Sequence, residues 1–238
     1  MSLLVSDLSF SYGSKTALDG VSFSVGRGQF AALLGPNGAG KSTLFSLLTR
    51  LFVTQGGAIS IARHDLAAAP LAAMADLGVV FQQTTLDLDL TVRQNLRYFA
   101  ALHGMSGRDA DQRIDAALHR LGMAERAGEK ARGLNGGHRR RTEIARALLH
   151  KPKVLLLDEP TVGLDAPTRA GLTQHIHDLC AETGVTVLWA THLTDEVRDT
   201  DQVILLHRGR VLADGRCGDL RGDRPLPAYF AQMTGATV

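Results

Sequence analysis

The sequence predicts an α/β fold with a parallel sheet, an antiparallel β subdomain at the N-terminus and an inserted α-helical subdomain. Three observations lead to this prediction. Residues 1 to about 30 contain segments in which apolar and polar residues alternate between turns, which is typical of a half-buried antiparallel sheet. Later apolar runs are continuous, as in buried parallel strands. Residues 86–151 interrupt these runs and are polar-rich with helical periodicity.

The length of 238 residues suits one α/β domain with an insertion, or two lobes. We expect a single domain over residues 1–238. Its core is expected to consist of residues 1–85 and 152–238, and its helical subdomain of residues 86–151. The two cysteines show no metal-binding spacing and no disulfide framework, which favours a reducing cytosol.

Charge and hydropathy restrict the partners. The net charge of +2 is too close to balance to indicate nucleic acid. No apolar stretch approaches the roughly 18 residues that a membrane-spanning helix needs. The segment Met1–Asp7 has no basic residue and is not a signal peptide. We therefore expect a cytoplasmic protein that contacts a membrane only through a partner.

The first part of the chain is expected to contain short strands joined by glycine turns. A helix follows the fourth strand and runs to about Leu51, and Pro70 limits the start of a second helix. The expected strands are Leu3–Val5, Leu8–Tyr12, Val21–Val25, Phe30–Leu34, Ala58–Ile61 and Gly78–Phe81, and the second helix is Ala67–Ala75.

Three helices are expected within residues 86–151. Thr91 is suited to cap the first of them, and Lys151-Pro152 stops the third. The second and third are expected over Arg108–Leu121 and His138–Leu149. The apolar residues at helical spacing are Val92, Leu96, Phe99 and Leu102 in the first helix and Ile114, Leu118 and Leu121 in the second.

After the insertion the apolar strands resume. Val154–Leu157 and Val185–Ala190 are continuous apolar runs of the parallel-strand type, and Thr168–Cys180 is the helix between them. A terminal hairpin is expected from Val203–Leu206 and Arg210–Ala213.

A glycine-rich loop lies between the strand Phe30–Leu34 and the next helix. It matches the pattern G-x-x-x-x-G-K-[ST], in the strand–loop–helix context that a phosphate-binding loop requires. Lys41 is expected to reach the β- and γ-phosphates of a nucleotide, and Ser42 to ligate Mg²⁺. The residues of the loop are Gly35, Pro36, Asn37, Gly38, Ala39, Gly40, Lys41, Ser42 and Thr43.

Four apolar strands end in polar groups: the glycine loop, Gln82, Asp158-Glu159 and Thr191-His192. Ligands of parallel sheets bind at the carboxyl ends of the strands, so we expect these groups to meet around the phosphates. Asp158 is expected to bind Mg²⁺, directly or through water. Glu159 is expected to accept a proton from the attacking water, or to orient it.

Two further roles follow from the same placement. His192 is expected to hydrogen-bond the γ-phosphate and to hold Glu159 and the water in place. Gln82 is expected to bind Mg²⁺ or the water, with Gln83 as the alternative. Tyr12 is either a partly buried strand residue or a platform that stacks on a base.

A second glycine element, Asn135-Gly136-Gly137, opens the third helix of the insertion. Its geometry suits another anion, while the three arginines Arg139–Arg141 conflict with the positive end of the helix dipole. We expect a bound anion or nearby acidic groups to offset that conflict. One nucleotide can use both glycine elements if two copies pack head to tail about a two-fold axis.

With these motifs in this order, the chain resembles the ATP-binding subunit of ABC transporters over nearly its whole length. The resemblance implies a P-loop NTPase core of the RecA-like type, with two ATP molecules held between two subunits. It also implies that Tyr12 stacks on adenine and that Asp165 belongs to the nucleotide site. The matching segments are Gly35–Thr43 (Walker A), Gln82 (Q-loop), Leu134–His138 (signature), Val154–Glu159 (Walker B), Gly163–Asp165 (D-loop) and His192 (switch histidine).

The signature departs from the usual L-S-G-G-Q, because Asn135 and His138 replace the serine and the glutamine. The Asn135 amide can still donate a hydrogen bond, so we expect an active protein with an altered rate. Leu86–Arg93 and Thr161–Asp165 look most like the ABC-2-type export branch, which includes drug, nodulation-signal and polysaccharide exporters. They also resemble ATPases associated with quinoprotein alcohol dehydrogenase systems.

The resemblance therefore implies an ATPase that uses ATP and Mg²⁺, forms a homodimer or ATPase pair on binding ATP, and drives a transmembrane permease from the inner face of the cell membrane. An alternative is a soluble ATPase of the same fold that acts in protein or cofactor assembly. A third class is a small-molecule kinase, which shares the glycine loop but needs an acceptor site and no Asn135-Gly136-Gly137 element.

Overall fold

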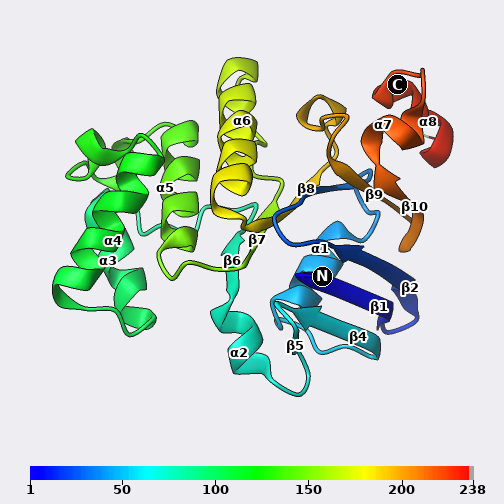
Figure 1. Ribbon diagram of the computed structural model, residues 1–238, viewed down its shortest axis with the longest axis horizontal. Helices are drawn as coiled ribbons and strands as arrows, with labels where there is room; N and C mark the ends of the chain where they lie inside the picture. Colours follow the sequence, from blue (N-terminus) through cyan, green and yellow to red (C-terminus); the bar gives the residue numbers. More distant parts are fainter. Residues whose placement is uncertain (236–238) are drawn as a thin grey trace.

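The computed structural model describes residues 1–235, which form two sheets with helices packed around them (Figure 1). The larger sheet has the strand order β10-β9-β3-β8-β7-β6. Its strands from β9 to β6 are parallel, and β10 pairs antiparallel with β9. The strands are β3 (Phe30–Leu34), β6 (Leu77–Val80), β7 (Val154–Asp158), β8 (Thr186–Thr191), β9 (Gln202–His207) and β10 (Arg210–Arg216).

Both faces of the parallel sheet are covered, which explains the continuous apolar runs. In β7, Leu156 packs on one face and Leu155 and Leu157 on the other. In β8, Leu188 and Trp189 divide between the faces in the same way. The hairpin expected near the C-terminus is confirmed as β9 and β10.

The smaller sheet is antiparallel, with the order β2-β1-β4-β5. The two N-terminal strands expected on either side of Asp7 are one strand with an irregularity, at which Asp7 has φ +50°. Gly57 packs against this irregularity, since a Cβ there would lie 2.4 Å from the carbonyl oxygen of Ser6. The strands are β1 (Leu3–Tyr12), β2 (Lys15–Val25), β4 (Gly56–Ile61) and β5 (His64–Asp65).

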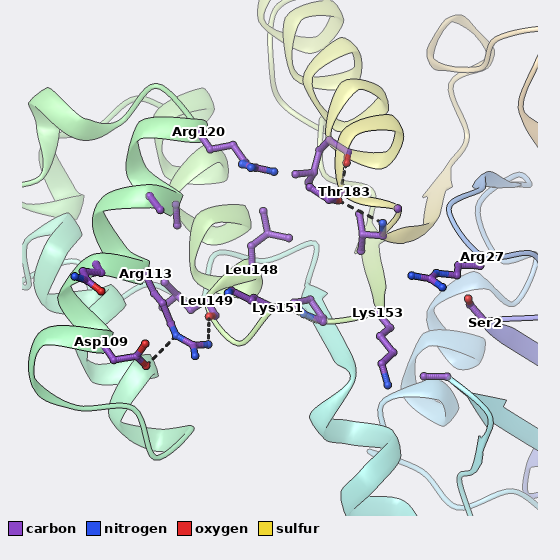
Figure 2. Close-up of a pocket in the computed structure, with 18 of the residues that line it drawn as sticks. Ser2, Arg27, Asp109, Arg113, Arg120, Leu148, Leu149, Lys151, Lys153 and Thr183 are labelled. Carbon is purple, nitrogen blue, oxygen red and sulfur yellow. Dashed lines mark hydrogen bonds and ion pairs between the residues drawn. The ribbon is translucent and has the colours of Figure 1, made fainter.

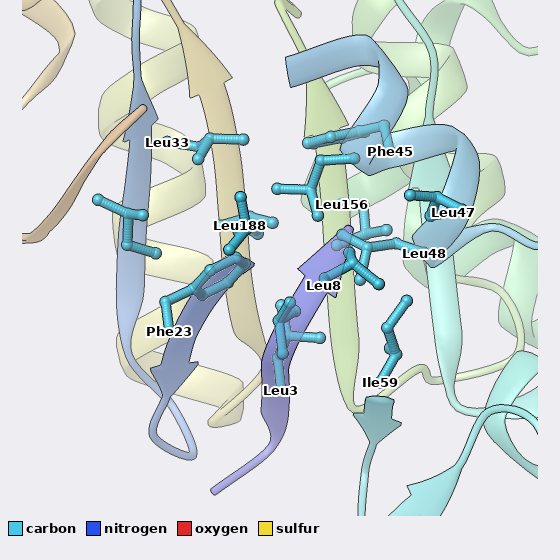
Figure 3. Close-up of a cluster of buried hydrophobic side chains, with 14 of the residues drawn as sticks. Leu3, Leu8, Phe23, Leu33, Phe45, Leu47, Leu48, Ile59, Leu156 and Leu188 are labelled. Atoms are coloured by element: carbon cyan, nitrogen blue, oxygen red, sulfur yellow. The ribbon is translucent and has the colours of Figure 1, made fainter. Parts of the chain in front are cut away.

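Helix α1 (Lys41–Leu48) lies between the two sheets. Figure 3 shows its side chains Phe45 and Leu48 directed into a cluster with Leu8 from β1 and Leu156 from β7. These side chains are buried. The helix that carries the end of the glycine loop is therefore held by apolar contacts on both sides.

Helices α3 (Val92–Leu102), α4 (Gly107–Arg120) and α5 (Gly136–Leu148) pack side by side, away from the antiparallel sheet (Figure 1). Thr91 and Gln94 form the capping box that starts α3. Leu102 follows the apolar spacing of α3, but its side chain is 66% exposed. The buried side chains of these helices include Val92, Leu96, Ile114, Leu118 and Ile144.

The remaining elements connect or flank these layers. They are α2 (Pro70–Ala75), α6 (Ala166–Thr183), α7 (Cys217–Arg221), α8 (Leu226–Thr234) and the 3-10 turns η1 (Ala124–Arg126), η2 (Ala131–Gly133) and η3 (Thr194–Glu196). The expected core range 152–238 includes three residues, 236–238, that lie outside the described residues. Within residues 1–235, every helix is too short or too polar to cross a bilayer.

Candidate functional site

The polar groups that follow the parallel strands come together at one edge of the larger sheet. The strands end level with one another: Leu34 pairs with Thr191, Asp158 with Ala190 and Val80 with Leu157. The glycine loop, Glu159, His192 and Gln82 therefore leave the sheet side by side. This convergence is the one expected from the sequence.

The glycine loop needs glycine for specific steric reasons. A Cβ on Gly35 would lie 2.4 Å from the carbonyl oxygen of Leu206. Gly40 has φ +114°, and its Cβ would lie 2.8 Å from Leu18 Cδ2. The loop is tied to the neighbouring hairpin by a hydrogen bond from Gly209 N to Ala39 O at 2.9 Å. Helix α1 begins at the next residue, so its free N–H groups face the loop.

Lys41 links the glycine loop to the end of β7. Its Nζ lies 3.3 Å from Glu159 Oε1 and donates to the carbonyl oxygen of Gly35 at 2.6 Å. Both side chains of the ion pair are buried. A cation is thus held next to the loop that wraps phosphate.

Glu159 is the centre of the site. Gln82 Nε2 donates to its Oε2 at 3.2 Å, and His192 Nδ1 lies 3.4 Å from its Oε1. The backbone of Glu159 is left-handed, with φ +44°, and such strain is found at functional sites. Lys41, Gln82 and His192, which were predicted from separate strands, all contact this one carboxylate. Gln83 makes no such contact among the described residues.

Asp158 is buried, and among residues 1–235 its carboxylate makes no hydrogen bond or ion pair. Burial, together with the neighbouring charge of Glu159, raises the pKa of Asp158 to about 6, although Lys41 and Arg140 oppose the shift. A divalent cation would favour the ionised form of such a group. Hard oxygen ligands from Asp158, Ser42 and Gln82 are of the kind that Mg²⁺ takes, so these residues fit the ion.

Tyr12 stands at the end of β1, next to α1. Its hydroxyl lies 3.3 Å from Thr43 Oγ1, at the end of the glycine loop. Its ring makes edge contacts with Phe10 and Phe52 and is 48% exposed. A half-exposed aromatic ring next to the loop is suited to stacking.

The second glycine element forms the start of α5. Asn135 is the N-cap, and its Oδ1 accepts from His138 N at 2.8 Å. The amide Nδ2 of Asn135 makes no hydrogen bond within the described residues and remains a donor. Asn135 and Gly136 are exposed.

The signature glycines also have a packing role that sequence reasoning missed. A Cβ on Gly137 would lie 2.6 Å from Thr168 Cγ2, and one on Gly136 would lie 3.2 Å from Leu164 Cδ2. Asp165, expected at the nucleotide, caps α6 and accepts from Thr168 N at 2.8 Å. That hydrogen bond, first among its causes, lowers the pKa of Asp165. The start of α6 therefore lies directly on the start of α5.

The expectation was that a bound anion or nearby acidic groups offset the three arginines of α5. An acidic partner is confirmed for Arg140, while Arg139 and Arg141 contact backbone carbonyl oxygens. Arg139 donates to the carbonyl oxygen of Ala131 at 3.0 Å, and Arg141 lies 3.4 Å from that of Leu121. Arg140 donates to the carbonyl oxygen of Gln82 at 2.8 Å. Backbone carbonyl oxygens, and for Arg140 also an acidic group, offset the positive charge of these side chains.

That acidic group is Glu143, which the sequence analysis did not single out. It is buried, and its Oε2 accepts from Arg140 at 2.9 Å while its Oε1 accepts from Thr85 N at 2.7 Å. Arg146 donates to the carbonyl oxygen of Thr85 at 3.0 Å. Arg140, Glu143 and Arg146, here called the α5 charge stripe, thus hold the segment Gln82–Thr85. Their spacing of three along the helix was the available signal.

A buried glutamate, Glu196, joins the loops after β7 and β8. Trp189 Nε1 donates to its Oε2 at 3.0 Å, and the Thr161 hydroxyl donates to its Oε1. Thr161 follows Glu159 by two residues, and Glu196 follows His192 by four. This contact holds together the two loops that carry Glu159 and His192.

Comparison with known proteins agrees with this site. The family model "ABC transporter" matches residues 18–162. The chain is 36% identical to the linearmycin resistance ATP-binding protein of Bacillus subtilis, over 89% of this chain and 70% of that one. It is 38% identical to a daunorubicin resistance ATP-binding protein of Streptomyces coeruleorubidus, over 89% and 67%. It is 38% identical to the Nod factor export ATP-binding protein I of Neorhizobium galegae, over 86% of this chain and 59% of that protein.

Solved structures with the same fold include an ATP-binding subunit of an ABC transporter, with a TM-score of 0.85 and 29% identity over 98% of this chain and 99% of that one. They also include a dimeric bacterial ABC transporter cassette, with a TM-score of 0.80 and 28% identity over 90% and 98%. The predicted α/β fold and the predicted likeness to the export ATPases are confirmed, while the likeness to quinoprotein-associated ATPases stays a prediction. This chain belongs to the ABC transporter ATP-binding family, the ATPase cassettes that bind ATP and power transport.

Proposed function

We propose that this chain is the ATP-hydrolysing subunit of an ABC-2-type exporter of small molecules. The names of its relatives support export, because they describe linearmycin resistance, daunorubicin resistance and Nod factor export. The chain spans only 59% of the Nod factor protein, so the activity of such a whole protein comes to this chain as a proposal. The observation that carries the proposal is the carboxylate of Glu159 within contact distance of Lys41, Gln82 and His192.

In the proposed reaction, Glu159 accepts a proton from the water that attacks the γ-phosphate. Lys41 neutralises charge on the phosphate oxygens, and His192 and Gln82 orient the carboxylate and the water. Tyr12 stacks on the adenine, and residues Gly35–Thr43 wrap the phosphates through backbone N–H groups. Glu159 is buried, so its interactions with charge are stronger than at the surface.

Mg²⁺ is part of the proposal. Ser42, Asp158 and Gln82 would hold the ion, and when bound it supplies positive charge to the β- and γ-phosphates. Asp158 supports this assignment because it is a buried carboxylate with no protein partner among the described residues.

We also propose that two copies close head to tail around ATP, so that Asn135, Gly136 and Gly137 of one copy bind the nucleotide of the other, with Asp165 of the adjoining loop at the interface. The exposed Asn135 and Gly136 at a helix N-terminus support this, because such groups are free to bind an anion. A dimeric cassette is among the structural relatives.

The partner in this proposal is a transmembrane permease, and the chain works at the inner face of the cell membrane, since no helix within residues 1–235 is long and apolar enough to cross it. The near-neutral charge of the chain supports a protein partner over nucleic acid. Purification of the full chain from detergent-solubilised membranes, with mass spectrometry of what remains bound, tests this part. Recovery of no membrane protein would contradict it.

The ATP-driven dimer is tested with the Glu159→Gln variant. Size-exclusion chromatography with light scattering, with and without ATP and Mg²⁺, should show a dimer only when both are present. The reason is that the amide keeps the shape of the side chain but does not take the proton, so ATP stays intact. A monomer under all conditions would overturn the head-to-tail dimer.

A further inference from the structure

A large cavity lies at the opposite edge of the parallel sheet from Glu159 (Figure 2). Its volume is about 890 Å³. It is bounded by α4, by the C-terminal end of α6 and by the residues that lead into β7 and β8, such as Lys153 and Val185. The glycine loop and Glu159 follow the carboxyl ends of the strands, so this cavity is separate from the nucleotide site.

The residues that line the cavity are strongly basic. They include six of the 26 lysines and arginines of the chain but only one of its 24 acidic residues, Asp109. The chain as a whole has a net charge of only +2, so positive charge is concentrated here. The six cations are Arg27, Arg63, Arg113, Arg120, Lys151 and Lys153.

Most of this charge is not neutralised by the protein. Arg113 pairs with Asp109 at 2.9 Å, and Lys153 pairs with Asp76 at 2.9 Å. The other four cations make no ion pair and no side-chain hydrogen bond within residues 1–235. Figure 2 shows Arg120 on α4 and Arg27 on opposite sides of the view, with Lys151 below Arg120. Clustered like charges repel one another, and an anion in the cavity would remove that repulsion.

The floor of the cavity is apolar. Leu149 and Val185 are buried side chains in its lining, and Leu148 and Leu179 lie beside them. The volume falls within the roughly 300–1,000 Å³ of sites that bind small molecules. Cations and apolar side chains in one lining suit a ligand with charged groups at one end and a flat or aliphatic body.

We propose that this cavity binds a small organic phosphate, a nucleotide-sized molecule that carries two or more phosphoryl groups on an apolar or ring-shaped body. A terminal phosphoryl group carries a charge of about −1.5 to −2 at neutral pH, so a ligand with two or more phosphoryl groups would offset much of the charge of the four unpaired cations. Arginine and lysine are the side chains that bind phosphate best. The ligand would bridge α4, the loop at Lys151 and the end of α6. This site is independent of ATP hydrolysis at Glu159.

The test uses the full chain with Lys41→Ala, which weakens phosphate binding at the glycine loop. Isothermal titration calorimetry measures the affinity of this protein for ADP and for pyrophosphate. The double charge reversal Arg120→Glu/Lys151→Glu in the same background should weaken ADP binding at least about tenfold, because it turns two attractions into repulsions. The apolar floor should make ADP bind more tightly than pyrophosphate.

The matched control is Arg108→Glu/Arg216→Glu, two exposed arginines outside the cavity, one of them on α4 as well. It should leave the affinity for ADP unchanged, and both double variants should unfold at the same denaturant concentration as their parent. Unchanged binding in Arg120→Glu/Lys151→Glu, or equal weakening in the control, would overturn the proposal. Equal affinities for ADP and pyrophosphate would overturn the part given to the apolar floor.

The proposal for the cavity and the proposal for the nucleotide site can be tested separately. With Lys41 intact, Arg120→Glu/Lys151→Glu should hydrolyse ATP at the rate of the unmodified chain when no other phosphate ligand is added. If that variant loses ADP binding at the cavity but keeps hydrolysis, the two sites are distinct. If it loses hydrolysis while it stays folded, the cavity is not independent of the ATPase site.

Discussion

Glu143 and Glu159 are both buried glutamates with cationic neighbours, yet their surroundings differ. Glu143 accepts hydrogen bonds of 2.7 and 2.9 Å from Thr85 N and Arg140. Glu159 has neighbours at 3.2 to 3.4 Å, contributed by the ends of three other strands, on a backbone with φ +44°. Glu143 is fully satisfied and fixes α5 to the Gln82–Thr85 segment. Glu159 is more loosely held, which suits the proton acceptor that we propose it to be.

The α5 charge stripe lies next to the site around Glu159. Arg140 holds the carbonyl oxygen of Gln82, while the side chain of Gln82 reaches Glu159. Burial, the largest cause, raises the pKa of Glu143 and lowers the pKa of Arg140. Breaking one partner of such a buried pair leaves the other uncompensated. Replacement by glutamine should therefore lower mainly the hydrolysis rate at Glu159 and mainly the free energy of unfolding at Glu143.

The largest effect is expected at Glu159. Glu159→Gln should lower the ATP hydrolysis rate about 10²- to 10⁴-fold, because it removes the proton acceptor. Its free energy of unfolding should fall less than that of Glu143→Gln, because the Lys41–Glu159 contact of 3.3 Å is longer than the Arg140–Glu143 contact of 2.9 Å and Lys41 also donates to the carbonyl oxygens of Gly35 and Pro36. Phosphate release and urea denaturation measure the two quantities. A large loss of stability together with the loss of hydrolysis would abolish the contrast with Glu143.

Glu143→Gln should lower the free energy of unfolding by about 3–5 kcal/mol, because Arg140 is left buried without its counter-charge. Urea denaturation measures this change. The control is Glu129→Gln, which breaks an ion pair of the same length, 2.9 Å, with Arg126 on the surface. That pair is 41–44% exposed, so its loss should cost no more than about 1 kcal/mol. Equal losses of unfolding free energy in Glu143→Gln and Glu129→Gln would mean that burial does not determine how much the α5 charge stripe stabilises the protein.

A smaller effect is expected at Asn135, the N-cap of α5. Asn135→Ala should cost about 1 kcal/mol of stability, because the N-cap hydrogen bond to His138 N is lost. Asn135→Ser keeps a cap and should preserve stability while it changes the hydrolysis rate. Steady-state hydrolysis by the purified protein with its partner checks the rate. Our expectation that Asn135 supports hydrolysis is wrong if the natural chain is inactive and Asn135→Ser restores turnover.

The smallest effect is expected from pH at His150, just beyond α5. Its Nε2 lies 3.0 Å from the carbonyl oxygen of Leu77, and burial, with His103 as the second cause, lowers the pKa of His150 from 6.5. The unfolded chain then binds more protons near pH 6, so the free energy of unfolding should fall as the pH drops below about 6.5. His150→Gln should flatten this profile, because glutamine does not titrate.

One outcome of the pH measurement would contradict the prediction for His150. Thermal unfolding of the unmodified chain and of His150→Gln, compared from pH 7.5 to pH 5.5, measures the slope. If both lose the same stability over that range, His150 does not contribute to the pH dependence. The other histidines with lowered pKa, such as His103 and His175, would then be its source.

The nucleotide edge was predictable because its signals are local. A glycine loop between a strand and a helix, and polar residues at the ends of apolar strands, need only the chain and the rule that parallel strands end together. Gln82, Glu159 and His192 were found in this way, from three separate strands. Their catalytic roles, and the subdomain boundaries at residues 86 and 151, stay predictions.

The α5 charge stripe was not predictable, because its signals are not local in the sequence. Glu143 lies among arginines on both sides, and a polar helix gives no sign of which charged residue points inward. The Gln82–Thr85 segment determines which charged residue points inward. Thr85 and Glu143, which are in contact, are 58 residues apart in the sequence. Leu102 is the opposite case, since it follows the apolar spacing but remains exposed at the end of α3.

The contact of Gly137 with Thr168 has a mechanical consequence. With a Cβ that would come within 2.6 Å of the methyl group, the two helix starts are in direct van der Waals contact and leave no room for sliding. A push on the tip of α5 must therefore displace the beginning of α6 as well. Since α6 begins at Ala166 and is joined to Glu159 by a short turn through Gly163, a displacement of α6 is passed toward the carboxylate through that turn.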